Sequence, residues 1–179
     1  MTTQQLTFDR DKAAVLIMDF TTGIVENAAS DPKGAVERAA HVLAATRRAG
    51  VPVIYVVPGG PDRPPATIHP GVQPVAGEPV VVKERFGAFS TTGLDTRLRQ
   101  MGKDTLVLLG VATSGCVLST ARWAFDLGYK LVIVEDACSD PEPEVHRALT
   151  QQQAHPKSYL GLWRMGQVTT AQEFSAALA

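Results

Sequence analysis

The feature that most limits how this chain can fold is an uninterrupted apolar run, Ala13–Met18, which stops at Asp19. A strand with one face in water alternates apolar and polar residues, but this run contains no polar position. A parallel sheet that is covered by helices on both faces buries such a strand completely. The run therefore predicts a central parallel strand with Asp19 at its carboxyl end.

Further short segments have the composition of strands and are separated by helical patterns. We expect these strands at 51–57, 80–82, 105–109, 130–134 and 167–169. Asp31 and Pro32 begin an amphipathic helix that stops before Gly50. Thr170 and Glu173 form a capping box for a last helix. Strands that alternate with helices predict a parallel α/β sheet.

Three more helices are expected from their end signals. One should begin with a capping box at Thr92 and close at Gly102. A second should run from Cys116 to Gly128, and a third should follow Pro141. These positions complete the alternation of strand and helix along the chain.

Length and charge limit the possible classes of protein. The chain has 179 residues, of which 45% are hydrophobic, and this suits one globular domain over residues 1–179. Its 17 basic and 18 acidic residues are not gathered in blocks, so we expect neither nucleic acid nor a membrane as a partner. A polar N-terminus, and no stretch approaching ~18 apolar residues, lead us to expect a cytoplasmic protein. In that reducing compartment Cys116 and Cys138 should both be free thiols.

Two segments have no expected regular structure. Residues 58–79 contain seven prolines and four glycines. This segment is longer than the irregular segments of most compact domains. That segment is either a wall of a functional site or a mobile linker, and its residues do not decide which. Residues 154–165 have no expected assignment either.

The stretch from Gly110 to Trp123 has the pattern of a strand, a tight turn and a helix, with Cys116 at the start of the helix. A helix N-terminus favours a thiolate and can lower a cysteine pKa to roughly 3.5–7.5. Cys116 is therefore a candidate nucleophile. The alternative is a buried cysteine that only fills space, which is common for free cysteines.

Asp19, Lys83 and Cys116 each follow a different predicted strand. In open parallel sheets the reactive groups gather outside the carboxyl ends of the strands. An acid, a base and a thiol that meet there can act as general base, electrostatic partner and nucleophile. Taken singly, Asp19 has the alternative of a turn-forming residue, and Lys83 that of a solvated strand end.

In this order and context the chain resembles the cysteine hydrolases of the isochorismatase-like superfamily over nearly its whole length. The motifs that carry the resemblance are the apolar strand ending in Asp19-Phe20, the segment Lys83-Glu84-Arg85-Phe86-Gly87-Ala88-Phe89 with Thr92 and Leu94, Gly110-Val111-Ala112-Thr113-Ser114-Gly115-Cys116-Val117, and Gly128-Tyr129 with Asp136-Ala137-Cys138. The resemblance implies a three-layer α/β/α fold with a six-stranded, mostly parallel sheet of Rossmann-like topology.

The resemblance also implies an Asp19–Lys83–Cys116 catalytic triad. In that family the Asp takes the thiol proton, the Lys supports the charge and the Cys attacks an electrophilic carbon. A cis peptide between Val111 and Ala112 is implied as well. The backbone N–H groups of Ala112 and Cys116 would then form the oxyanion hole that a tetrahedral intermediate needs.

Departures from better-known members narrow the expected reaction. Metal-dependent nicotinamidases have an Asp-x-His pair and a further His after the second strand, whereas this chain has Asp62 and only His69. We therefore expect no metal and no cofactor. The intact Cys116 context favours an amide, carbamoyl or ureido C–N bond in a small molecule. The alternatives are an isochorismatase-type vinyl ether hydrolase and a non-catalytic flavodoxin-like binding module, although no glycine-rich phosphate loop follows the first strand.

Four aromatic residues are candidates for substrate binding because they adjoin the proposed triad in sequence or lie two helical turns beyond it. They are Phe20, Phe86, Phe89 and Trp123. Core or interface packing is the alternative for each of them. We also expect a homo-oligomer, because related hydrolases are commonly oligomeric and the segment around Leu160, Leu162 and Trp163 is apolar.

Overall fold

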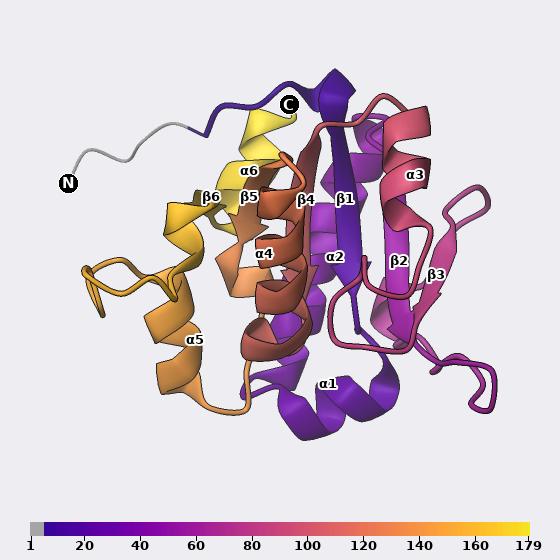
Figure 1. Cartoon of the computed structure of the whole chain (residues 1–179), viewed down its shortest axis with the longest axis horizontal. Helices are drawn as coiled ribbons and strands as arrows, with labels where there is room; N and C mark the ends of the chain where they lie inside the picture. The colour runs from indigo at the N-terminus through magenta and orange to yellow at the C-terminus, as the bar shows by residue number, and fades with distance from the viewer. Residues whose placement is uncertain (1–5) are drawn as a thin grey trace.

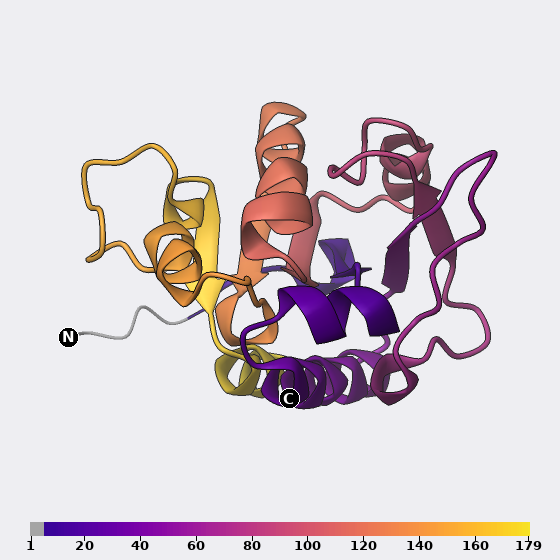
Figure 2. The same cartoon turned by 90° about the horizontal axis from the view of Figure 1, so that it is seen from below.

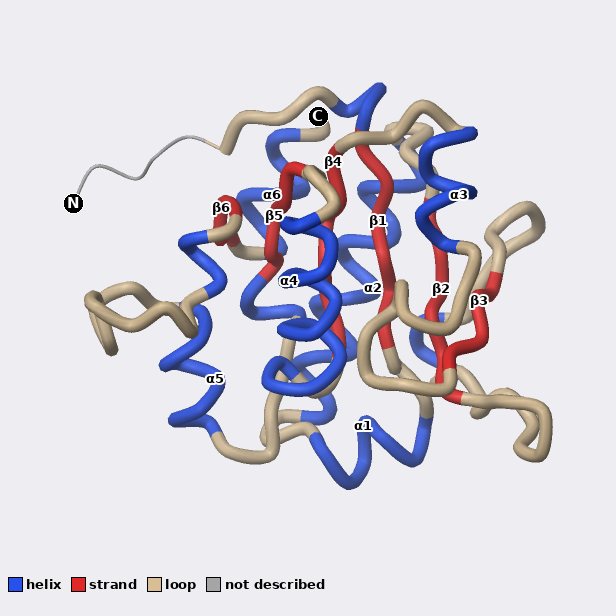
Figure 3. The backbone as a smooth tube through the Cα atoms, in the orientation of Figure 1, coloured by secondary structure: helices blue, strands red, loops and turns tan. Residues whose placement is uncertain are grey.

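The structure, a computed structural model, describes residues 6–179 and contains a single six-stranded sheet in that range; residues 1–5, part of the expected polar N-terminus and of the expected domain, lie outside the described residues. Its strands are β1 (Ala13–Met18), β2 (Val53–Pro58), β3 (Val80–Lys83), β4 (Thr105–Gly110), β5 (Lys130–Val134) and β6 (Gly166–Thr169). All neighbouring strands are parallel, in the order β3-β2-β1-β4-β5-β6 (Figures 1 and 3). The expected parallel α/β sheet is confirmed, and β1 and β5 have the bounds that the sequence predicts.

Helices cover both faces of this sheet. They are α1 (Thr22–Ala28), α2 (Pro32–Arg48), α3 (Leu94–Gln100), α4 (Leu118–Asp126), α5 (Pro143–Thr150) and α6 (Ala171–Ala177). Figure 2 shows α2 and α6 on one side of the sheet and α3 and α4 on the other. The fold is therefore the three-layer α/β/α arrangement, and this explains why β1 and β4 carry no polar face.

The two central strands, β1 and β4, are buried at every position. Their register pairs Met18 with Gly110, so the residues that follow these two strands start side by side. From β1 the chain first adds strands on one side, β2 and β3, and then crosses to add β4, β5 and β6 on the other. The strand order thus reverses between β1 and β4, and in open parallel sheets the ligand crevice lies outside such a point.

The ends of three helices differ from the sequence prediction. At α3 the N-cap is Gly93, and Thr92 does not form the expected capping box, because its hydroxyl donates to Ala88 O and accepts from Leu94 N–H. The helix expected after Pro141 begins at Pro143. Cys116 is not in the first turn of α4 but in a π-helical turn, Thr113–Val117, that precedes it.

Helix α1 has no counterpart among the predicted helices. It follows β1 directly after Asp19 and Thr21, and its Val25 is buried. Its N-cap, Thr21, is a residue type that often caps helices, but its side chain makes no capping hydrogen bond here. The helix lies at the edge of the sheet where the strands end (Figure 1).

The capping box of α6 is present in the structure, with Thr170 Oγ1 accepting from Glu173 N–H at 3.2 Å and the Glu173 carboxylate accepting from Thr170 N–H. Replacing Thr170 by Ala should lower the free energy of unfolding by about 0.5–2 kcal/mol, because a backbone donor loses its partner. Urea denaturation measures this change. Thr170→Ser keeps the hydroxyl and should retain most of the stability; equal losses in both variants would contradict the capping explanation.

Candidate active site

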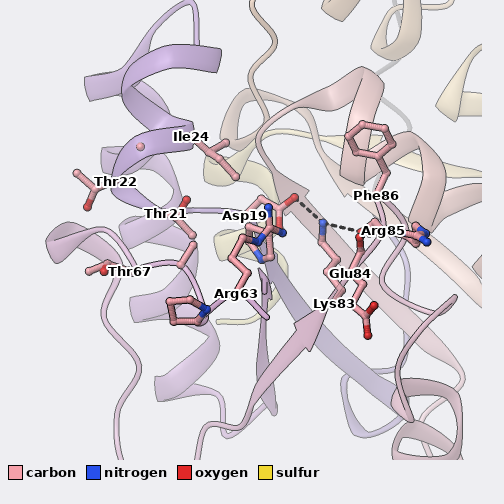
Figure 4. Close-up of a pocket in the computed structure, with 14 residues that line it drawn as sticks. Asp19, Thr21, Thr22, Ile24, Arg63, Thr67, Lys83, Glu84, Arg85 and Phe86 are labelled. Carbon is pink, nitrogen blue, oxygen red and sulfur yellow. Dashed lines mark hydrogen bonds and ion pairs between the residues drawn. The ribbon is translucent and has the colours of Figure 1, made fainter. Parts of the chain in front are cut away.

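A pocket of about 810 Å³ opens at the carboxyl edge of the sheet, between the end of β1, the start of α1, the segment after β2 and the end of β3 (Figure 4). Its lining residues are Asp19, Thr21, Thr22, Gly23, Ile24, Pro58, Arg63, Pro64, Ala66, Thr67, Lys83, Glu84, Arg85 and Phe86. Two of the three predicted triad residues, Asp19 and Lys83, therefore face this pocket. The third, Cys116, is not among the lining residues and is only 1% exposed.

Asp19 and Lys83 form a buried ion pair at the base of the pocket. Lys83 Nζ donates to Asp19 Oδ2 at 2.8 Å and to Arg85 O at 3.1 Å, as the dashed lines in Figure 4 mark. The two side chains are 7% and 3% exposed. Burial raises the pKa of Asp19 above its ordinary value, and the charge of Lys83 opposes that rise.

The second oxygen of the same carboxylate, Asp19 Oδ1, is buried and has no hydrogen-bond partner among residues 6–179. A buried carboxylate oxygen without a donor is costly, because it has lost its water. The backbone of Asp19 is also unusual, with φ at 57°, which few residues other than glycine adopt. Such conformations and unpaired groups gather at functional sites.

Cys116 lies beside Asp19, and its environment differs from the sequence prediction. Burial raises the pKa of the Cys116 thiol well above its ordinary value, and the negative charge of Asp19 raises it further. The low pKa that the sequence predicted for Cys116 is therefore wrong. The thiol points at backbone carbonyls, with Sγ at 3.4 Å from Val111 O and 3.6 Å from Ala112 O.

The turn that carries Cys116 has little free space around it. The Val111–Ala112 peptide is cis, as the resemblance implies. A Cβ on Gly110 would stand 2.8 Å from Met18 O and 3.2 Å from Cys116 Sγ, so only glycine fits there. At Gly115 a Cβ would make only an ordinary contact, 3.9 Å from the side chain of Ala112.

The same turn is fixed by residues that follow β5. Thr113 N–H donates to Ser139 O at 2.8 Å, and Ser114 N–H donates to Asp140 Oδ2 at 2.7 Å. Thr113 Oγ1 also donates to Ser139 O and lies 2.8 Å from His146 Nδ1, so His146 is assigned as the donor in that contact. Sequence reasoning missed these supports, because His146 has no partner nearby in the sequence.

Cys138, the other cysteine, is also buried, and burial raises its pKa to about 12. It belongs to the hydrophobic core. Cys138 is therefore a packing residue of the core and a free thiol.

The predicted aromatic residues are placed differently from one another. Phe86 is 73% exposed and lines the pocket. Phe20 is in the core, and Phe89 packs against Tyr129 with ring centroids 5.9 Å apart. Trp123 lies on α4, is 44% exposed and does not line the pocket. The structure therefore brings only Phe86 together with the Asp19–Lys83 pair.

The proline- and glycine-rich segment 58–79 forms one wall of the pocket, which decides between the two interpretations of it. Ala66 N–H donates to Pro58 O at 2.9 Å, and Thr67 O accepts from Thr22 N–H at 3.0 Å. His69 N–H donates to Phe20 O at 2.9 Å. The segment is thus fastened directly to the residues that follow Asp19.

Neither a metal-binding cluster nor a membrane-spanning helix is found in the described part of the chain. No three His, Cys, Asp or Glu side chains within residues 6–179 are grouped so that they could hold a metal ion. His69 Nδ1 accepts a hydrogen bond from Gly71 N–H at 3.0 Å. No helix in the same range is both long and apolar enough to cross a bilayer.

Known proteins share both the sequence and the fold. A sequence model of the isochorismatase domain matches residues 13–173. An uncharacterised isochorismatase family protein of Escherichia coli O157:H7 is 35% identical over 155 residues, which are 74% of this chain and 82% of that protein. Maleamate amidohydrolase of Pseudomonas putida is 31% identical over 171 residues, 81% of this chain and 80% of that enzyme. The solved structure of an isochorismatase family protein from Burkholderia thailandensis matches with a TM-score of 0.81 at 31% sequence identity. The match covers 96% of this chain and 97% of that protein's chain.

The partly buried contact of His146 with Thr113 leads to a prediction about how the free energy of unfolding depends on pH. Burial lowers the pKa of His146, although the charge of Asp140 opposes this. As pH falls below the ordinary value of about 6.5, the unfolded chain takes up the proton first, so this residue lowers stability in acid. Urea unfolding at pH 8 and pH 5 should show that His146→Asn, which keeps a donor, loses less stability on acidification than the unsubstituted protein. Replacing exposed His155 by Asn is the control, and an equal change there would contradict the assignment.

Proposed function

Because the chain belongs to the isochorismatase family of hydrolases, we propose that it cleaves an amide, carbamoyl or ureido C–N bond of a small substrate through a covalent intermediate on Cys116. The similarity to maleamate amidohydrolase, which is named for hydrolysis of an amide, supports this bond type. The intact thiol beside a carboxylate supports it independently, because a thiol adds readily to a carbonyl carbon. Hydrolysis of a vinyl ether needs a general acid and water, so that reaction would leave the thiol of Cys116 without a role.

The observation that carries the proposal is the unpaired oxygen of Asp19. Oδ2 is occupied by Lys83, whereas buried Oδ1 has no donor and lies in the carboxylate beside Cys116. A thiol that must lose its proton therefore has a free acceptor next to it. Lys83 keeps the carboxylate ionised when the proton has left again, and it cannot itself accept the proton while it is charged.

The raised pKa of Cys116 fits activation by a base better than a preformed thiolate. The resting thiol keeps its proton and donates to backbone carbonyls. When substrate fills the pocket, the side chain turns about its Cα–Cβ bond from Val111 O toward the carbonyl carbon. Asp19 then takes the proton as the sulfur attacks, and its raised pKa makes it a stronger base than an exposed aspartate.

The remaining steps follow from the balance of protons and bonds. The carbonyl oxygen gains negative charge in the tetrahedral intermediate, and we assign the N–H groups of Ala112 and Cys116 as its donors. The C–N bond breaks as Asp19 returns its proton to the leaving nitrogen, which leaves a thioester on Cys116. Water then attacks the thioester carbon with Asp19 again as base. The C–S bond breaks, the thiol regains its proton and the acid product leaves.

Among the aromatic candidates, we assign direct substrate contact to Phe86, because it alone lines the pocket. Phe20 and Phe89 support the site from within the core. Trp123 is exposed on α4 and does not line the pocket, so we assign it no contact with the substrate.

The triad proposal predicts a large loss of activity for two substitutions. Cys116→Ala and Asp19→Asn should each lower kcat by roughly 10⁴-fold or more, because members of one nucleophilic unit fail together. Ammonia release from primary amides and N-carbamoyl compounds, and pyruvate release from isochorismate, measure turnover. Intact-protein mass spectrometry detects the adduct on Cys116. For the unsubstituted protein, kcat/KM should fall in acid with a pKa above the ordinary aspartate value of about 3.9.

Controls make that result specific. Cys138→Ala should retain activity, because that thiol is part of the core. Asp19→Asn leaves Lys83 buried without its partner, so circular dichroism must show that each variant is folded. Full activity of folded Cys116→Ala would exclude the covalent mechanism, and turnover of isochorismate alone would exclude the amide assignment.

We also propose that the chain forms a homo-oligomer. Tyr159 and Leu160 are 86% and 51% exposed and lie together after α5, which is unusual for apolar side chains in water. Leu162, the centre of the apolar segment in the sequence, is instead buried within the chain itself. Light scattering across micromolar concentrations should give a multiple of the 19.1 kDa chain mass. A monomeric mass throughout that range would exclude the proposal.

A further inference from the structure

Arg63 is an exposed residue that lines the pocket, and no acid among residues 6–179 forms an ion pair with it. Its side chain makes no ion pair or hydrogen bond within residues 6–179, whereas Lys83 is paired with Asp19. Figure 4 shows Arg63 extending toward Asp19, while Glu84 and Arg85 point away from the Asp19–Lys83 pair. A guanidinium in that place has all its donors available to a ligand.

The backbone holds Arg63 in position before any ligand arrives. Gly60 N–H donates to Arg63 O at 2.9 Å, and Arg63 N–H donates to Gly60 O at 3.1 Å, which closes a tight turn. Two prolines follow directly and restrict the chain further. The turn also packs on β3, because a Cβ on Gly59 would stand 2.5 Å from the Val82 side chain. The backbone of this turn therefore loses little further conformational entropy when a ligand binds.

Much of the remaining pocket wall is apolar. It is formed by the side chains of Ile24, Pro58, Pro64, Ala66 and Phe86. Such walls accept a hydrocarbon chain and offer it no hydrogen bonds. The pocket thus combines the Asp19 carboxylate, apolar walls and the Arg63 guanidinium.

We infer that Arg63 binds a carboxylate on the substrate, so that the preferred substrates are amides or ureido compounds that carry a carboxylate at the other end of a short hydrocarbon chain. This inference rests on the proposed function, because it places the scissile group at Asp19 and Cys116. A planar guanidinium binds a carboxylate through two parallel N–H···O bonds, which gives both affinity and orientation. A neutral analogue of the same length loses those bonds and leaves the guanidinium unpaired.

The test compares amides that differ by one charge. The probes are succinamate, glutaramate and adipamate, each with its methyl ester, assayed for ammonia release. At least one acid of the series should exceed its ester in kcat/KM by roughly 10- to 100-fold, the size of effect expected for a charge-assisted hydrogen bond. Arg63→Ala should remove this preference mainly by raising KM for the acid, and Arg63→Lys should restore part of it. Arg48→Ala, an equal loss of charge on α2 at the opposite edge of the sheet, should leave the preference intact.

A binding measurement separates this inference from the proposed function. Calorimetry with the inactive Cys116→Ala variant should show tighter binding of the acid than of its ester, and the added Arg63→Ala substitution should abolish the difference. Equal kcat/KM values for acids and esters, or a preference that survives Arg63→Ala, would overturn the inference while the hydrolase proposal stands. Charge-dependent binding without turnover of any amide by the unsubstituted protein would keep Arg63 as a carboxylate-binding residue and overturn the hydrolase proposal together with the substrate class.

Discussion

The buried ion pair between Lys83 and Asp19 constrains the whole carboxyl edge of the sheet, because two charges inside a protein are tolerated only when they satisfy each other. Strand register sets this contact: β3 ends level with the end of β2, and β1 ends level with β4. Removal of one partner of a buried pair typically costs about 3–5 kcal/mol. The pair therefore ties the stability of the fold to the chemistry of the pocket, and Asp19→Asn tests both at once.

Two effects compete at Cys116, and their balance decides how the thiol can react. A helix terminus contributes about 0.3–1 kcal/mol to a nearby charge, and Cys116 lies in a π-helical turn that precedes the first residue of α4. Burial and the negative charge of Asp19 oppose a thiolate more strongly, so the pKa of the thiol rises. The positive charge of Lys83 acts the other way but is already engaged by Asp19. In the mechanism that we propose, the thiol becomes reactive only when a substrate turns it toward its base.

The sequence predicted those parts of the structure that a short segment determines by itself. Apolar runs gave β1 and β5 at their observed bounds, because a strand that is buried on both faces needs apolar residues at every position. The chain position of Asp19 and Lys83 after strands predicted their meeting at one edge. The contact of Thr113 with His146 and the place of Arg63 could not be predicted, because each depends on segments that only the fold brings together. Helix α1 was missed because it has only seven residues and two of them, Gly23 and Asn27, are poor helix formers. The pKa of Cys116 was mispredicted because burial is a tertiary property.

The residues that line the pocket all fall between positions 19 and 86, whereas the turn that carries the thiol and the residues that brace it fall between 110 and 146. The pocket, including the proposed base Asp19, thus comes from the first half of the chain, and the proposed nucleophile Cys116 comes from the second half. The wall after β2 lies outside the segments whose hydrogen bonds hold Thr113 and Ser114. We therefore expect that this wall can be exchanged by protein engineering while the turn that carries Cys116 is left unchanged.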